Sequence, residues 1–237
     1  MDGVVKRDKL YEGKAKIVYS TDDPDLLIIH FKDAATAFNG KKKGSIPGKG
    51  AMNAEISAIF FGVLQRSGIP THFEALLGAD EMLAKRVGIV PVEVVVRNVV
   101  AGSLAKRLGL PEGTALGRPV LEFYYKNDEL GDPMINEYHI YAVGLATERE
   151  MSEITRLAMK CDEVLREFLE PRDIELVDFK LEFGRYGDSI ILADEVTPDT
   201  CRFWDRNTRE KMDKDRFRRD LGGVEEAYRE VLRRVRS

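Results

Sequence analysis

The alternation of charged and apolar residues between positions 176 and 184 constrains the fold more than any other feature of the chain. The segment reads LVDFKLEFG, so Asp178, Lys180 and Glu182 take every second position and apolar residues lie between them. A β-strand sends successive side chains to opposite faces. The pattern therefore predicts a strand with one apolar face and one charged face. Such a charged face fits a metal ion and an anion, and the alternative is an exposed face with ordinary salt bridges.

A second segment brings another acid toward this face. Residues 191–195 read ILADE and follow GRYGD, whose turn chemistry predicts a β-hairpin. Glu182 and Asp194 share a face only if the turn holds an odd number of residues. A three-residue loop near Gly187 meets this condition, and a two-residue loop would place the two acids on opposite faces. Because Mg²⁺ is bound through one or two carboxylates plus phosphate and water, the hairpin predicts a magnesium site at Glu182 and Asp194.

Length and charge exclude several classes of protein. The 237 residues allow one large domain or two modest ones, and the formal net charge of -4 argues against a nucleic-acid binder driven by overall charge. The two cysteines form no CxxC motif, so neither a zinc site nor a disulfide framework is expected. The first ten residues lack an apolar signal region, and no apolar run is long enough to span a membrane. We expect a cytoplasmic protein that does not bind membranes.

Hydrophobic periodicity predicts an α+β fold. Strands and helices come in clusters, which favours α+β over a doubly wound parallel sheet. Thr147 and Glu150 form a capping box at the start of the longest helix. A loop rich in glycine and lysine occupies residues 40–50. The expected strands are 10–19, 26–31, 92–96 and 120–125, and the expected helices are 52–66, 103–108, 147–169, 213–221 and 224–235.

Two further groups of residues suit anions. Lys14 and Lys16 are expected on one face of a strand, where they would hold phosphates as point charges or merely protect an edge strand. Arg97 ends a strand beside Ser103, the expected N-cap of a short helix, and this pair resembles a small phosphate or carboxylate site or an ordinary cap. Arg202 lies close to Asp194 in sequence and is a candidate for the same pocket.

Other polar residues carry weaker signals. The lysine-rich loop before residue 52 favours anions, although a mobile solvated loop explains it equally well. The three histidines, His30, His72 and His139, have no partner at metal or triad spacing and are expected to be structural. Alternating charges over residues 211–219 favour a solvated helix face.

Six segments in the same order together resemble one enzyme family. They are LYEGKAKIVY (10–19), VPVEVVVRNVVAGSLAKRLG (90–109), KNDELGDPMINE (126–137), LVDFKLEFG (176–184), LADEVTPDTCRFWD (192–205) and KMDKDRFRRDLGG (211–223). The chain resembles the phosphoribosylaminoimidazole-succinocarboxamide synthase (SAICAR synthetase) family of purine biosynthesis along nearly its whole length.

The resemblance implies a reaction and an architecture. ATP, L-aspartate and 5-amino-1-(5-phosphoribosyl)imidazole-4-carboxylate (CAIR) would give SAICAR, ADP and phosphate, with Mg²⁺ as the cofactor. An N-terminal β-rich, antiparallel ATP-binding lobe (1–87) and a larger α+β lobe (88–237), which carries the imidazole nucleotide and metal sites and ends in two helices, would hold the nucleotide in the cleft between them. The family is usually a homodimer or a higher homo-oligomer.

The resemblance also implies roles for individual residues. Around the nucleotide, Lys14, Ala15 and Lys16 match the phosphate-contacting segment, Lys126 matches a residue near the nucleotide, and Glu182 and Asp194 match the magnesium acids. For the imidazole nucleotide, the matching residues are Arg97, Ser103 and Arg202 at its phosphate, Asp178 and Lys180 at its carboxylate end, and Lys214 and Arg218 as further anion contacts. Two positions depart from the family pattern: Thr36 replaces a serine, and Asn39 replaces an aspartate and cannot act as a charged metal ligand.

Amide formation from a carboxylate requires activation, because oxide is too poor a leaving group. We expect the imidazole carboxylate to attack the γ-phosphate and the aspartate amine to attack the resulting acyl phosphate, with the protein positioning groups and neutralising charge. Lys180 would hold the reacting carboxylate, and Asp178 would contact the exocyclic amine or accept a proton. The alternatives are a small-molecule kinase, which needs no amine substrate, and a nucleotide-binding regulator without turnover.

Overall fold

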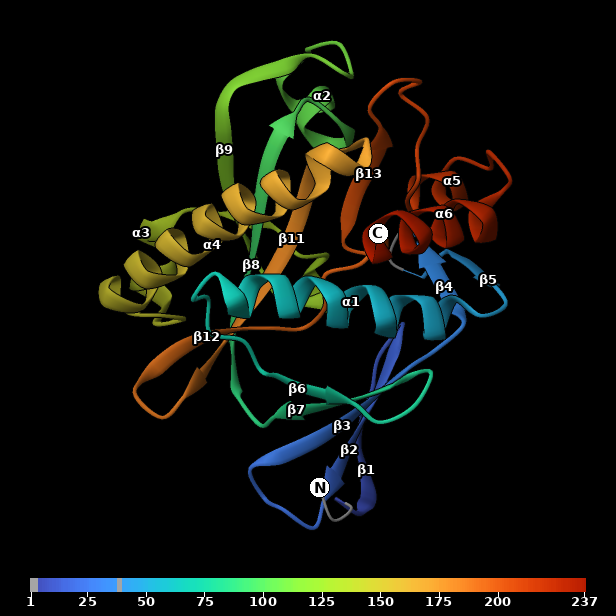
Figure 1. Cartoon of the computed structure of the whole chain (residues 1–237). Coiled ribbons are helices and arrows are strands. Elements are labelled where there is room, and N and C mark those ends of the chain that lie inside the picture. Colours follow the sequence, from blue (N-terminus) through green and yellow to red (C-terminus); the bar gives the residue numbers. More distant parts are fainter. Residues whose placement is uncertain (1–3, 38–39) are drawn as a thin grey trace.

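The computed structural model describes residues 4–37 and 40–237 and shows a mixed α+β fold built on antiparallel sheets (Figure 1). The expected fold class is therefore confirmed. The strands are β1 (Lys6–Glu12), β2 (Lys16–Thr21), β3 (Leu26–Phe31), β4 (Ala34–Ala37), β5 (Lys42–Ser45), β6 (Phe73–Leu76), β7 (Glu81–Lys85), β8 (Gly88–Val99), β9 (Ala115–Tyr125), β10 (Met134–Ile135), β11 (Ile174–Tyr186), β12 (Ser189–Ala193) and β13 (Cys201–Asp205). The α-helices are α1 (Lys49–Arg66), α2 (Gly102–Leu108), α3 (Glu137–Val143), α4 (Glu148–Leu169), α5 (Asp215–Arg218) and α6 (Val224–Arg236).

The first sheet has the strand order β1-β2-β3-β7-β6. Residues 10–19 do not form one strand, because the chain reverses between β1 and β2, where the Gly13 amide donates to the Lys16 carbonyl at 2.9 Å. Lys14 lies in this turn and Lys16 begins β2. The expectation that the two lysines share a strand face is therefore wrong.

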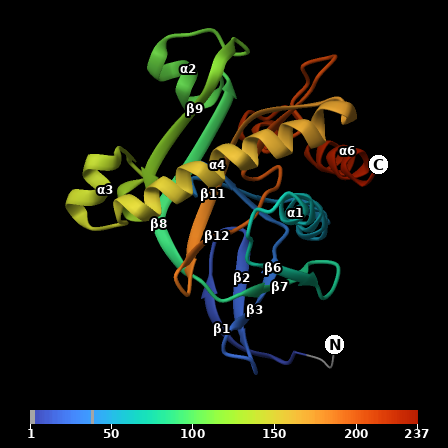
Figure 2. The ribbon, with the colours of Figure 1, turned by 60° about the vertical axis from the view of Figure 1, so that its left-hand side comes forward.

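The second sheet has the order β10-β9-β8-β11-β12, with β13 also paired to β11. Helix α4 packs against β11, and helix α1 contacts α4, α6 and strands of the first sheet (Figures 1 and 2). Apolar side chains from both sheets and from these helices form one continuous core, which includes Phe60, Leu157 and Phe183. Strand β11 is thus packed by apolar residues on one face, which leaves its charged face for the site.

Helix α4 follows its prediction closely. Thr147 is the N-cap, and its side chain and that of Glu150 form the expected capping box. Apolar residues at helical spacing form a buried stripe along α4, namely Ile154, Leu157, Ala158, Cys161 and Leu165, and the Cys161 thiol is not in a disulfide. Local signals of this kind are reliable because they depend on helix geometry alone.

The segment 211–219 departs from its prediction. Only Asp215–Arg218 is helical, and Asp213 and Asp215 are 0% and 1% exposed. The Asp213 carboxylate accepts hydrogen bonds from the amides of Phe203 and Asp215, at 3.0 and 2.7 Å, which ties the segment to β13. The prediction of a solvated helix face is therefore wrong for this segment.

Among the helices of residues 4–37 and 40–237, none has the length and apolar composition that a membrane span requires.

Candidate active site

The charged face of β11 is buried. Asp178 and Glu182 are 3% and 4% exposed, so an exposed face with ordinary surface salt bridges is excluded. Lys180, between them, donates from Nζ to Glu182 Oε1 at 2.5 Å and to Glu93 Oε1 of β8 at 2.9 Å. Buried charges are tolerated only when they are paired and hydrogen-bonded, so the sheet supplies partners from the neighbouring strand.

The hairpin turn is shorter than expected. Tyr186 pairs with Ser189, so the loop holds two residues, and Glu182 pairs with Ala193 rather than with Asp194. The three-residue loop is therefore wrong. The two acids nevertheless approach the same ammonium group, because Asp194 Oδ2 lies 3.6 Å from Lys180 Nζ. Asp194 lies just past the end of β12 with a φ of 61°, and this left-handed conformation takes it out of the strand alternation.

A cavity of about 420 Å³ opens beside these groups. One part of its wall is apolar and includes Val18, Leu27 and Ile29. The charged part contains every residue that the sequence assigns to the nucleotide and the metal, namely Lys14, Ala15, Lys16, Lys126, Glu182 and Asp194, together with Lys180. Apolar walls beside a few convergent charged groups are typical of a site for a small molecule.

The lysines of this cavity are already paired. Lys14 contacts Asp128 at 2.7 Å, Lys126 contacts Glu182 at 2.9 Å, and Lys16 contacts Asp194. Burial alone would lower the pKa of Lys16 and Lys180, but the neighbouring carboxylates outweigh it and raise both pKa values. Burial alone would raise the pKa of Asp194, but Lys16 and Lys180 hold it well below its usual range. The ammonium groups of Lys16 and Lys180 and the carboxylate of Asp194 therefore stay charged at neutral pH.

Several residues of the cavity were not predicted as site residues, among them Glu195 and His72. Glu195 is 5% exposed, with Oε1 3.4 Å from Lys16 Nζ and with no hydrogen-bond partner for Oε2 among the described residues. His72, which the sequence treats as structural only, lines the same cavity, and burial lowers its pKa to about 4. The only signal for Glu195 is its position directly after Asp194, whereas His72 carries no local signal.

A second cluster, the arginine cluster, surrounds Arg97. Its Nη1 donates to Asp178 at 2.6 Å, its Nε donates to Glu122 at 2.7 Å, and its Nη2 donates to Ser103 Oγ at 3.0 Å. Ser103 therefore does not cap α2; Ala101 is the N-cap residue. Arg97 and Ser103 do meet as predicted, but through their side chains.

Arg202 completes this cluster. It contacts Asp178 and Asp215, each at 2.9 Å, rather than Asp194. Gly102 permits this packing: its φ is 53°, and a Cβ atom there would lie 2.5 Å from Arg202 Nη2. Arg218 contacts the other side of Asp215 at 2.6 Å. Guanidinium and carboxylate groups thus alternate through the cluster.

The remaining predicted residues lie at the edge of the site or outside the described ranges. Lys214 Nζ lies 3.8 Å from Asp199 Oδ2. Thr36 is in β4, and Asn39 lies outside the described residues. Glu122, Arg107 and Asp215 were not predicted as site residues, although Glu122 bridges Arg97 and Arg107.

Glu182 and Asp194 match a magnesium site in their chemistry. Among residues 4–37 and 40–237, no group of three or more histidine, cysteine, aspartate or glutamate side chains is arranged to hold a metal ion. Magnesium needs only one or two carboxylates, because phosphate and water supply its other ligands. The two acids around Lys180 therefore fit this ion when a phosphate group is present.

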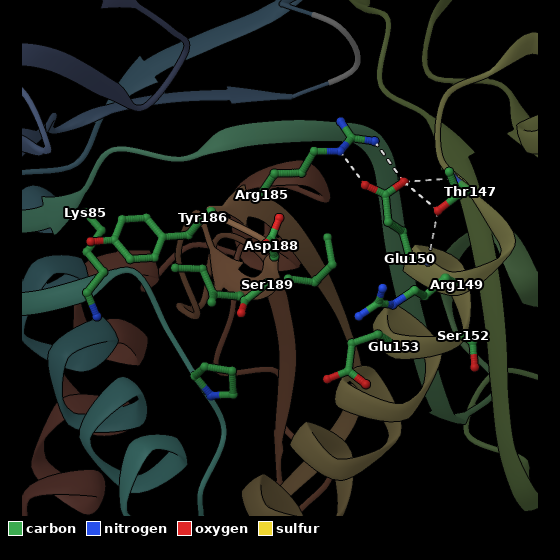
Figure 3. Close-up of a pocket in the computed structure, with 14 residues that line it drawn as sticks. Lys85, Thr147, Arg149, Glu150, Ser152, Glu153, Arg185, Tyr186, Asp188 and Ser189 are labelled. Carbon is green, nitrogen blue, oxygen red and sulfur yellow. Dashed lines mark hydrogen bonds and ion pairs between the residues drawn. The ribbon is translucent and has the colours of Figure 1, made fainter.

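A larger hollow, of about 1140 Å³, lies elsewhere (Figure 3). It lies between the tip of the β11–β12 hairpin and the start of α4. Arg185 donates a hydrogen bond to Glu150, and the same carboxylate accepts a hydrogen bond from the Thr147 amide. None of the predicted site residues lines this hollow. Size alone therefore does not identify the active site in this protein.

An α+β fold with a charged cavity beside an arginine cluster is typical of an enzyme that binds phosphorylated substrates. A model of the SAICAR synthetase family matches residues 9–235. A phosphoribosylaminoimidazole-succinocarboxamide synthase from Coprothermobacter proteolyticus is 60% identical over 231 residues, which are 97% of this chain and 98% of that protein. The chain belongs to the SAICAR synthetase family.

Solved structures of other SAICAR synthetases have the same fold as this chain. The crystal structure of the synthase from Ehrlichia chaffeensis has a TM-score of 0.95 at 47% identity and covers 97% of this chain and 98% of that one. A SAICAR synthetase in complex with ADP has a TM-score of 0.93 at 52% identity and covers 95% of this chain and 96% of that one. The fold therefore follows the family across both sheets.

Proposed function

We propose that the chain is an ATP-dependent ligase that joins L-aspartate to the carboxylate of CAIR and releases SAICAR, ADP and phosphate. Family membership supports this reaction, and the related synthetase was solved with ADP. The observation that carries the proposal is the convergence of Lys16, Lys180, Glu182 and Asp194 on one cavity that also has an apolar wall.

ATP is assigned to this cavity. The base would rest against the apolar wall that includes Val18, Leu27 and Ile29, and Lys14 and Lys16, with the Ala15 backbone between them, would meet the phosphates. Lys126 would do the same from the opposite sheet. When bound, Mg²⁺ held by Glu182 and Asp194 would neutralise phosphate charge. Each lysine would exchange a carboxylate partner for a phosphate oxygen, so the site needs little rearrangement.

The imidazole nucleotide is assigned to the arginine cluster. Arg97, Ser103 and Arg202 offer donors to its phosphate, and Lys214 and Arg218 add positive charge at the edge. Asp178 accepts hydrogen bonds from both Arg97 and Arg202. This geometry favours a role for Asp178 in positioning the two guanidinium groups over a role in proton transfer.

The chemistry then takes two steps. A carboxylate oxygen of CAIR attacks the γ-phosphorus, the bond to the bridging oxygen breaks, and ADP leaves. The aspartate amine attacks the acyl carbon, phosphate leaves with the bonding electrons, and the nitrogen loses a proton. Lys180 would hold the reacting carboxylate, and Lys16 would offset negative charge on the transferred group.

We propose a boundary between the two lobes at residues 87 and 88, because the chain passes from the first sheet to the second between β7 and β8. The cleft between the lobes would then hold ATP, because the cavity takes residues from both sheets. We propose a homodimer or higher homo-oligomer, which the exposed side chains of Leu130, Tyr138 and Val143 support. The two buried cysteines, which form no disulfide, support a cytoplasmic location.

An ADP-release assay tests the reaction. With CAIR, ATP and Mg²⁺ present, ADP should form steadily only when L-aspartate is added. A small-molecule kinase would instead build up a stable phosphorylated product without aspartate, and a regulator would release no ADP under either condition. Mass spectrometry of the product then distinguishes SAICAR from a phosphorylated imidazole.

A further inference from the structure

A buried ion cluster lies behind the site, centred on Asp199. Lys49 Nζ donates to Asp199 Oδ2 at 2.7 Å, and the two side chains are 1% and 3% exposed. The Tyr228 hydroxyl donates to the other carboxylate oxygen at 2.6 Å. Lys49 begins α1, Asp199 lies between β12 and β13, and Tyr228 is in α6. One carboxylate therefore joins three elements that are distant in sequence.

Lys214 lies next to this ion cluster, and its side chain is more exposed than those of Lys49 and Asp199. Its Nζ lies 3.8 Å from Asp199 Oδ2, and its backbone amide donates to the Pro198 carbonyl at 3.0 Å. Lys214 is also the residue directly before α5, whose Asp215 binds Arg202. The same loop therefore holds both the main chain and the side chain of Lys214 next to the arginine cluster.

The loop that carries Asp199 is itself firmly attached. The Lys180 amide donates to the Thr200 carbonyl at 2.9 Å, and the Val196 amide donates to Ser57 Oγ of α1 at 3.3 Å. Thr197 Oγ1 accepts a hydrogen bond from the Asp199 amide at 3.2 Å. Asp199 is thus a fixed anchor.

The charges that face Lys214 oppose one another. Burial lowers the pKa of Lys214 below its ordinary value of 10.5, Asp199 raises it, Arg218 and Lys49 lower it, and Glu195 raises it. Burial would also raise the pKa of Asp199, but Lys214 and Lys49 hold it well below its usual range. Asp199 is therefore ionised, and it is the strongest attraction that keeps a proton on Lys214.

We propose that Asp199 is a positioning residue that keeps the Lys214 ammonium charged and fixed beside the arginine cluster, where it meets an anionic group of the imidazole nucleotide. Lys49 and Tyr228 are the other hydrogen-bond partners of the Asp199 carboxylate. The inference rests on the proposed function only through the assignment of Lys214 to that substrate.

Competitive labelling with acetic anhydride tests the electrostatic part without substrate. The intact protein is labelled at a series of pH values, and mass spectrometry of its peptides gives the pH midpoint of acetylation at Lys214. The exposed Lys106 is the internal reference. Asp199→Asn should lower the midpoint by about one pH unit, and Lys49→Met should raise it, because each removes one charge of opposite sign. Tyr228→Phe removes a hydrogen bond without removing a charge and should leave the midpoint unchanged.

A wild-type midpoint in Asp199→Asn, or a lowered midpoint in Lys49→Met, would overturn the proposal. If Asp199→Asn does not fold, the upward shift in Lys49→Met decides, provided that this variant keeps the wild-type Tm, because loss of packing would expose Lys214 and also raise the midpoint. Tyr228→Phe is the control for structural damage: a shift in it equal to that of Asp199→Asn would also overturn the proposal.

Kinetics then test the use of Lys214. The alkaline fall of kcat/KM for CAIR should move with the labelling midpoint in Asp199→Asn and Lys49→Met, while the KM for ATP changes less than about twofold. A fall that stays at the wild-type pH would overturn the assignment. If even the wild-type protein does not consume CAIR, the proposed function fails, but the labelling result still decides what Asp199 does.

Discussion

Replacing Glu182 with glutamine separates its proposed role at the metal from its role in folding. The carboxylate accepts from Lys126 at 2.9 Å and from Lys180 at 2.5 Å, and it is 4% exposed. Glutamine keeps the volume and one acceptor oxygen but removes the charge. The variant should therefore fold, while Mg²⁺ loses one of its two proposed protein ligands.

The stability loss follows from the two hydrogen bonds. A bond to a charged group contributes about 1.5–3 kcal/mol and a neutral one about 1 kcal/mol. The Lys126 side chain is 42% exposed, so solvent screens its bond to less than about 1 kcal/mol. Lys180 keeps Glu93 at 2.9 Å. We expect a loss of about 1–2 kcal/mol, which lowers Tm by about 2–8 °C for a chain of this size.

Turnover should fall much more, by about 100-fold or more, as when one group that stabilises transition-state charge is removed. Coupled ADP release with CAIR and L-aspartate measures it, at several Mg²⁺ concentrations. Glu93→Gln is the matched control, because Glu93 pairs with Glu182 across the ladder and binds the same lysine. It should lose less than about tenfold. The reasoning is refuted if Glu182→Gln keeps more than a tenth of wild-type turnover, or if both variants lose the same amount.

Three further predictions concern single residues. Arg202→Ala should raise the KM for CAIR while the KM for L-aspartate stays within about twofold, and the reverse result in steady-state kinetics would remove Arg202 from the imidazole nucleotide site. Between pH 6.5 and 4 the unfolded chain protonates His72, whereas the folded chain keeps it neutral. The free energy of unfolding should therefore fall by up to about 3 kcal/mol on acidification over this range. In thermal melts, His72→Gln should flatten that part of the curve of stability against pH. Thr147→Ala should lower stability by about 0.5–2 kcal/mol through loss of the cap on α4, with unchanged kcat, as urea denaturation and the ADP assay can check.

Local patterns predicted the elements, and departures from them arise where the backbone leaves regular geometry. The start of α4 was predictable because a capping box and an apolar stripe act within a few residues of each other. The hairpin was predictable, but its loop length was not, because glycine and aspartate suit both turn lengths. The convergence of Glu182 and Asp194 depends on the left-handed backbone of Asp194, and strand periodicity says nothing about that.

The partners of the predicted arginines were harder to find. Arg97 was a candidate because it ends a strand, but Glu122, its partner, is 25 residues away and lies on β9. Asp215 was hidden within a run of alternating charges that resembles a solvated helix. Only the sheet register and the folding of the C-terminal segment bring these acids to the guanidinium groups. Pattern reasoning thus finds the groups proposed to bind substrates more readily than the buried groups that hold them in place.

The pairing of every proposed cation with a carboxylate explains how such a crowded site stays folded before substrates arrive. Lys16, Lys126 and Lys180 would repel one another in a buried cavity, and Glu182, Asp194 and Glu93 offset that repulsion. In the proposed reaction, substrate phosphates would replace carboxylates as partners of lysines that are already in place. The reorganisation cost is met during folding rather than during the reaction, which is the condition for effective electrostatic catalysis. The same logic applies to the arginine cluster, where Asp178 and Asp215 hold guanidinium groups at fixed positions in the site proposed for the phosphate of the imidazole nucleotide.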